Sequence, residues 1–155
     1  METIRIVFSR AWYQPFSLAV RALTWSNYSH CGIMLDDNTV IESTFLNGGV
    51  KIATFDEFKK RATAWEIREY DVKDAAAIMA AAKSQINRPY NWIALLGILF
   101  HVGSWLGRGT WFCSEFIAFA FWKAGQPLFN EQFVARIVPQ FLWMLPSRFV
   151  ASSNG

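Results

Sequence analysis

The sequence predicts an α+β domain in which helices pack on one face of an antiparallel sheet. Segments rich in alternating or β-branched residues dominate residues 3–70, and helix-forming segments dominate the rest. Strands and helices that separate along the chain in this way are typical of α+β folds. The length of 155 residues fits one domain, 1–155, that buries about 70% of its unfolded surface.

The first half supplies the strands. A helix is expected at 15–24, because Pro15 suits a first helical turn and the apolar residues after it share one face. Thr54, with Glu57 three residues later, forms a capping box for a short helix that ends near Lys60. Strands are expected at 3–9, 29–35, 39–45, 50–53 and 64–70, where β-forming residues are common.

The second half supplies the helices. Asp71 or Asp74 caps a helix at 75–86. The apolar run 91–105 is shorter than the ~20 residues of a membrane span, so it is a buried or an interfacial helix. Further helices are expected at 113–124, which ends before Gly125, and at 139–145, and the tail from Ala151 is expected to fray.

Composition and charge favour an apolar core and exclude a strongly charged surface. The chain is 53% hydrophobic and 17% aromatic. Residues 1–75 hold nine Lys/Arg against ten Asp/Glu, and residues 76–155 hold six against two. The mildly cationic second half suits peripheral membrane contact, and an aromatic core with scattered basic residues explains it equally well. We expect no nucleic-acid partner.

The cysteine and histidine content indicates a protein without a disulfide framework or a metal. Cys31 and Cys113 are too few for such a framework, and no Cys or His pair has the spacing of metal ligands. We therefore expect no metal and no organic cofactor. Residues 1–10 carry no apolar signal region, so we expect cytoplasmic synthesis, and delivery by another route if the protein acts in the envelope.

Cys113 begins a predicted helix, and this position suits a nucleophile. The free N–H groups and positive dipole end of a helix stabilise a thiolate and lower the thiol pKa from about 8.5. The same N–H groups can bind an oxyanion after a carbonyl is attacked. The alternative is that Cys113 is a small hydrophobic residue of the core.

A cysteine nucleophile needs a base, and the chain has two histidines. His101 lies in the apolar run, where packing is its ordinary role. His30 begins a strand in which side chains alternate, so Cys31 faces the core and His30 faces the other side. We therefore interpret Cys31 as structural.

Glu42 is a carboxylate within an otherwise apolar and β-branched strand, where an unpaired charge is costly. A two-residue hairpin loop would place Glu42 opposite Ile33, away from His30. A three-residue loop, 36–38, places it opposite Gly32, on the face of His30. We favour the longer loop, because such loops commonly end in a left-handed residue and Asn38 tolerates that conformation.

Four short motifs resemble the circularly permuted papain-like group of the NlpC/P60 superfamily, the YiiX-like amidases and hydrolases. They occur in order within residues 26–126. In unpermuted members of the superfamily the cysteine helix precedes the histidine strand, whereas here it follows it. The motifs are Ser29-His30-Cys31-Gly32-Ile33, Val40-Ile41-Glu42, Pro89-Tyr90-Asn91-Trp92 and Trp111-Phe112-Cys113-Ser114-Glu115.

The resemblance implies a sheet packed against the nucleophile helix, with Cys113 as nucleophile, His30 as base and Glu42 orienting the imidazole. Tyr90, next to Pro89, is a candidate to line the substrate cleft. The acyltransferase branch of this group has Asn-Cys-Glu-His around its cysteine, and this chain has Phe112-Cys113-Ser114-Glu115 instead, which makes the acyltransferase activity the less favoured expectation.

The sequence therefore predicts a papain-like thiol hydrolase that cleaves amide bonds of peptide or isopeptide type, with peptidoglycan peptides among the substrates considered. One alternative is a lipid ester hydrolase or acyltransferase that uses the same nucleophile. The other is a membrane-associated binding module without enzymatic activity, in which Cys113 belongs to the core.

Overall fold

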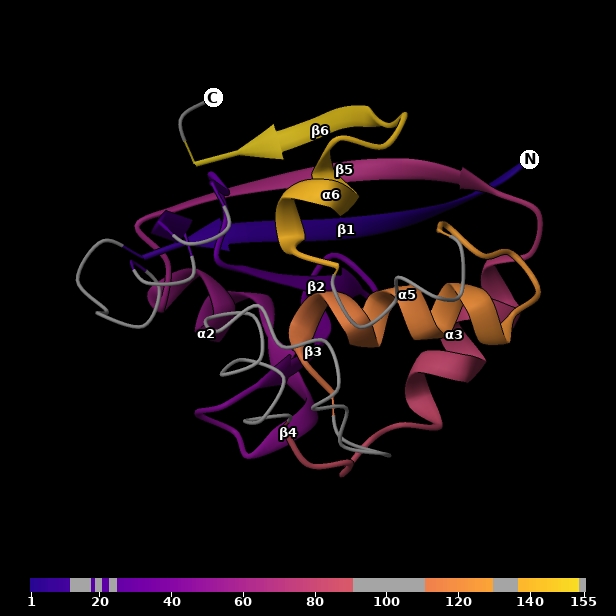
Figure 1. Ribbon diagram of the computed structural model, residues 1–155, viewed down its shortest axis with the longest axis horizontal. Coiled ribbons are helices and arrows are strands. Elements are labelled where there is room, and N and C mark those ends of the chain that lie inside the picture. The colour runs from indigo at the N-terminus through magenta and orange to yellow at the C-terminus, as the bar shows by residue number, and fades with distance from the viewer. Residues whose placement is uncertain (12–17, 19–20, 23–24, 91–110, 130–136, 154–155) are drawn as a thin grey trace.

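The computed structural model of the chain describes residues 1–11, 18, 21–22, 25–90, 111–129 and 137–153. Among these residues the central element is an antiparallel sheet of six strands in the order β4-β3-β2-β1-β5-β6 (Figure 1). The strands are β1 (Glu2–Arg10), β2 (His30–Met34), β3 (Thr39–Thr44), β4 (Gly49–Thr54), β5 (Ala64–Val72) and β6 (Arg148–Ser152). The predicted α+β class is confirmed.

The hairpin of β2 and β3 has the register that a three-residue loop predicts. Glu42 pairs with Gly32, and the N–H of Leu35 donates to the carbonyl of Thr39 at 2.9 Å. Asp36 closes the loop, because its carboxylate accepts the N–H groups of Asn38 and Thr39, each at 2.8 Å. The prediction that Glu42 shares the face of His30 is therefore correct.

Gly32 is required at this pairing because the neighbouring strand approaches closely. A Cβ atom on Gly32 would lie 2.6 Å from Cγ1 of Val40 and 3.3 Å from Cβ of Glu42. A larger residue here would push β3 away and move the Glu42 carboxylate.

Helices cover both faces of the sheet, although the sequence predicted one covered face. The first face carries α3 (Ala75–Lys83), α5 (Cys113–Lys123) and α6 (Pro139–Trp143) on a core that includes Ile6 and Ile33. The second face carries α2 (Phe55–Lys60), whose Phe58 packs with Val7, Met34, Val40 and Ile67. The difference arises because the Thr54–Glu57 capping box, correctly predicted, starts a helix that lies against this face.

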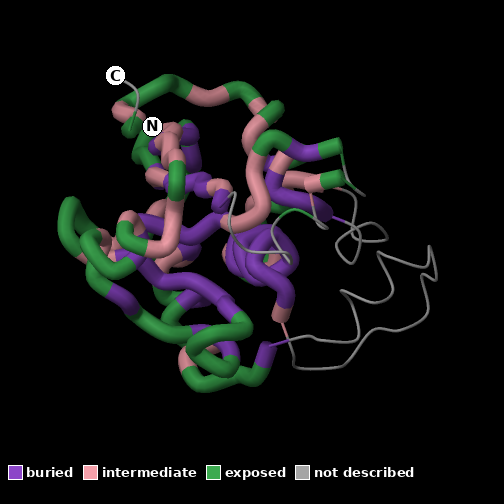
Figure 2. Tube along the Cα trace, turned by 90° about the vertical axis from the view of Figure 1, so that its left-hand side faces the viewer, coloured by how far each residue is buried: buried purple, intermediate pink, exposed green. Residues whose placement is uncertain are grey.

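The helix α5 packs on β2 and β3 and lies beside α3 (Figure 1). Nearly its whole length is buried, as Figure 2 shows. Only Phe119, Trp122 and Lys123 are not fully buried. An apolar pattern around the whole circumference predicts such a buried helix.

Several predicted element ends differ from the structure: the last helix, α6, ends at Trp143 and not at residue 145, and two other differences bear on the packing. The helix α3, capped by Asp74, ends at Lys83 and not at residue 86. Beyond it the chain has already turned toward β4, because the Asn87 N–H donates to the Val50 carbonyl at 2.9 Å. The tail does not fray at Ala151: β6 pairs with β5, and Arg148 forms an ion pair with Glu69 at 2.8 Å.

The predicted helix at 15–24 lies mostly, and the apolar run 91–105 wholly, outside the described residues. Within the described part of the chain, no helix has both the length and the apolar character to cross a membrane.

Candidate active site

Cys113 is the first residue of α5, at the position that its sequence context predicts. The preceding Phe112 is extended, and its N–H donates to Oε2 of Glu115 at 3.1 Å. Upstream, the carbonyl of Trp111 accepts the hydroxyl of Ser43 at 2.6 Å, which ties the start of the helix to β3. The sulfur therefore lies at a helix N-terminus whose position is fixed by the sheet.

His30 is the first residue of β2, and its imidazole contacts Glu42 and interacts electrostatically with Cys113. Nε2 lies 2.6 Å from Oε2 of Glu42. Because the carboxylate occupies Nε2, Nδ1 is the ring nitrogen left for the sulfur of Cys113. The ring also packs beside Phe58, with 5.6 Å between centroids.

The proton distribution favours a thiolate and an imidazolium. Burial raises the pKa of the Cys113 thiol, but hydrogen bonds from Cys31 and His30 outweigh it and lower that pKa to about 5. Burial lowers the pKa of His30, but hydrogen bonds to Cys113 and Glu42 and the charges of both raise it to about 9. Between these pKa values the charged forms of both side chains, thiolate and imidazolium, are favoured.

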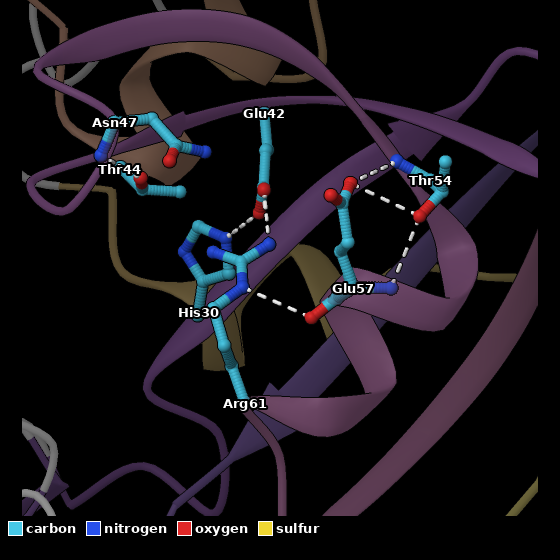
Figure 3. A network of polar contacts seen from close by, with 7 residues as sticks. All are labelled: His30, Glu42, Thr44, Asn47, Thr54, Glu57 and Arg61. Atoms are coloured by element: carbon cyan, nitrogen blue, oxygen red, sulfur yellow. Dashed lines mark hydrogen bonds and ion pairs between the residues drawn. The ribbon is translucent and has the colours of Figure 1, made fainter.

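Glu42 is completely buried and is held by two cations, as Figure 3 shows. His30 contacts Oε2, and Nη2 of Arg61 donates to Oε1. Burial alone would raise the pKa of Glu42, and these two partners lower it below the usual range. The carboxylate therefore remains ionised beside the imidazole.

Sequence reasoning missed Arg61. A signal was present: the cost of burying Glu42 with one partner implies a second cation. The sequence does not reveal that this second cation is Arg61, because the pairing depends on where α2 lies against β3.

A cavity of about 330 Å³ opens beside this cluster. Tyr90, the predicted cleft residue, lies in its wall and is 7% exposed. Cys113 is 1% exposed and is not among the described residues that line the cavity. Other lining residues include His30, Ser43, Phe45, Leu46, Phe58 and Arg61.

Cys31 lies in the core, as alternation predicts, and is fully buried. It also does more than pack, because its thiol and its backbone N–H interact with the sulfur of Cys113 and lower the pKa of the Cys113 thiol. The second histidine, His101, lies outside the described residues. The described residues contain no group of three or more His, Cys, Asp or Glu side chains that could bind a metal ion.

Residues 5–140 match the family described as permuted papain-like amidase enzyme, YaeF/YiiX, C92 family. No curated protein matches the chain. Its fold is similar to a crystal structure of a protein described as metalloprotein YiiX from Escherichia coli O157:H7, at 18% identity and a TM-score of 0.69. That similarity covers 97% of this chain and 96% of the YiiX chain. Since the family match spans most of its length, the chain belongs to the C92 family of permuted papain-like amidases.

Proposed function

We propose that this protein is a cysteine amidase in which Cys113 is the nucleophile, His30 the acid and base, and Glu42 the residue that orients the imidazole. The single observation that carries the proposal is the contact set of His30. Its ring meets a buried carboxylate at 2.6 Å, and its interaction with the Cys113 sulfur at a helix N-terminus raises the pKa of the ring and lowers that of the thiol.

The first half of the reaction forms a thioester. The Cys113 thiolate attacks the amide carbonyl carbon, and the carbonyl oxygen becomes an oxyanion near the N-terminal amides of α5. The His30 imidazolium donates its proton to the amide nitrogen as the carbon–nitrogen bond breaks, and the amine leaves. Glu42 keeps the ring oriented and stabilises its charged form.

The second half regenerates the enzyme. The neutral imidazole of His30 removes a proton from water, which attacks the thioester carbonyl. The carbon–sulfur bond then breaks, so that the carboxylic acid leaves and the thiolate and imidazolium are restored. One amide and one water give one acid and one amine.

The substrate in this proposal carries an acyl group that fits the cavity beside His30. Phe45, Leu46, Phe58 and Tyr90 make much of its wall apolar. This wall also supports the second candidate, hydrolysis or transfer of lipid acyl esters by the same nucleophile. Peptide amides, including peptidoglycan peptides, remain our first choice because the family is one of amidases.

The test uses paired amides and esters that share one acyl chain, together with peptidoglycan fragments. We expect amide hydrolysis by the wild type, loss of hydrolysis in Cys113→Ala, and a thioester on Cys113 that mass spectrometry detects after acid quenching. Full amide hydrolysis by a pure, folded Cys113→Ala sample would refute the mechanism. Hydrolysis of the esters alone would favour the second candidate. Phospholipid vesicles added to either assay would show whether membrane contact alters the rate.

A further inference from the structure

Glu42 has a second cationic partner that the proposed reaction does not use. The guanidinium of Arg61 donates through Nη2 to Oε1, while His30 occupies Oε2. Both oxygens of the buried carboxylate are therefore held, one by a permanent cation and one by a group that gains and loses a proton.

The position of Arg61 is fixed by α2. It is the C-cap residue of this helix, and its Nε donates to the backbone carbonyl of Glu57 at 3.1 Å (Figure 3). Glu57 in turn closes the capping box with Thr54, whose N–H donates to Oε2 of Glu57 at 2.9 Å. The guanidinium also lies 5.8 Å from the centre of the Phe58 ring. A short helix on the second face of the sheet thus presents a cation to the active site.

The charged groups around His30 come from three different elements. Glu42, on β3, and Cys113, at the start of α5, both interact with the His30 ring. Arg61, at the end of α2, contacts Glu42. On β1 the residue paired with His30 is Ser9, which carries no charge. Among the described residues, Arg61 is therefore the permanent cation that contacts this carboxylate.

A permanent cation matters when His30 gives up its proton to the leaving amine. Without Arg61, the buried carboxylate would then face a neutral ring and no counter-charge, so that release of the proton would be disfavoured. With Arg61 present, Glu42 is compensated in both protonation states of His30.

We propose that Arg61 is a positioning residue of the active site, which holds Glu42 in place and ionised while His30 loses and regains its proton. This inference rests on the proposed function. Without the Arg61 charge, Glu42 attracts the imidazolium more strongly. His30 is then a weaker acid, so that expulsion of the amine is slower.

The test compares Arg61→Met and Arg61→Lys with the wild type by NMR titration of the histidine rings. With two histidines in the chain, His101→Asn assigns the signals. In Arg61→Met we expect the His30 midpoint to rise by about one pH unit or more. We also expect kcat for a model amide to fall about tenfold or more, with little change in KM. Arg61→Lys keeps the charge and should return the midpoint to within about half a unit of the wild type.

Arg68→Met is the matched control, because Arg68 is also partly buried and pairs with a carboxylate, Glu66, that does not contact His30. We expect the control to lower thermal stability and leave the His30 midpoint unchanged.

A His30 midpoint that stays the same or falls in Arg61→Met would overturn the proposal. If Arg61→Met does not fold, Arg61→Gln decides, because it keeps a hydrogen-bond donor without the charge. Its His30 midpoint should also rise, and an unchanged or lower midpoint would overturn the proposal. The titration needs no substrate, so it gives a result even if the protein cleaves no amide.

Discussion

Nε2 of His30 lies 2.6 Å from Oε2 of Glu42, although the two residues belong to different strands and are twelve positions apart. They meet because Glu42 is paired with Gly32, two residues beyond His30 on the same face of β2. The length of one hairpin loop therefore determines whether the imidazole has a carboxylate partner.

The first prediction concerns the charge of Glu42. Glu42→Gln keeps the shape of the side chain and removes the charge that stabilises the imidazolium. We expect kcat to fall about 10²-fold or more, as measured on a model amide. Glu66→Gln is the control, since Glu66 binds Arg68 elsewhere on the sheet. Equal activities of the two variants would argue against a role for Glu42.

The second prediction concerns Cys31, whose thiol is a cause of the lowered pKa of Cys113. Cys31→Ala removes the donor, so we expect the Cys113 pKa to rise by about one to two units. Cys31→Ser keeps a hydroxyl donor, so the pKa of Cys113 should stay close to its lowered wild-type value. The pH dependence of Cys113 alkylation measures both variants. If Cys31→Ala has the wild-type midpoint, the contact between the thiols has no electrostatic effect.

The third prediction concerns the start of α5. Glu115→Ala removes the carboxylate that accepts the Phe112 N–H and leaves this buried donor without that partner. We expect the free energy of unfolding to fall by about 1–2 kcal/mol in urea denaturation. Glu115→Gln retains an acceptor oxygen and should lose less. A larger loss in the Gln variant than in the Ala variant would contradict this account of the helix start.

The sequence was sufficient for contacts that depend on local rules. The alternation of side chains placed His30 and Cys31 on opposite faces, and a three-residue loop gave the correct register. The reason given for that loop was wrong, because Asn38 is not left-handed: among the described non-glycine residues, only Trp25 and Asn87 have a positive φ. The capping box at Thr54 and Glu57 was readable for the same reason, because both residues belong to one turn.

Contacts between distant elements could not be predicted in this way. Arg61 reaches Glu42 only because α2 folds onto the second face of the sheet. Cys31 reaches Cys113 only because α5 crosses the first face at β2. The edge strand β6 was missed because its pairing depends on β5 as partner, and its own five residues carry a weak pattern.

The central claim is that Cys113 is a thiolate paired with the imidazolium of His30. The most direct measurement is the rate of iodoacetamide alkylation at Cys113 as a function of pH, with mass spectrometry separating its label from that of Cys31. Because the Cys113 pKa is lowered to about 5, the rate should rise through that pH and stay level toward neutrality. In His30→Ala the midpoint should move upward, since the partner charge is gone. A wild-type midpoint at about 8.5, the ordinary value for a free thiol, would contradict the account.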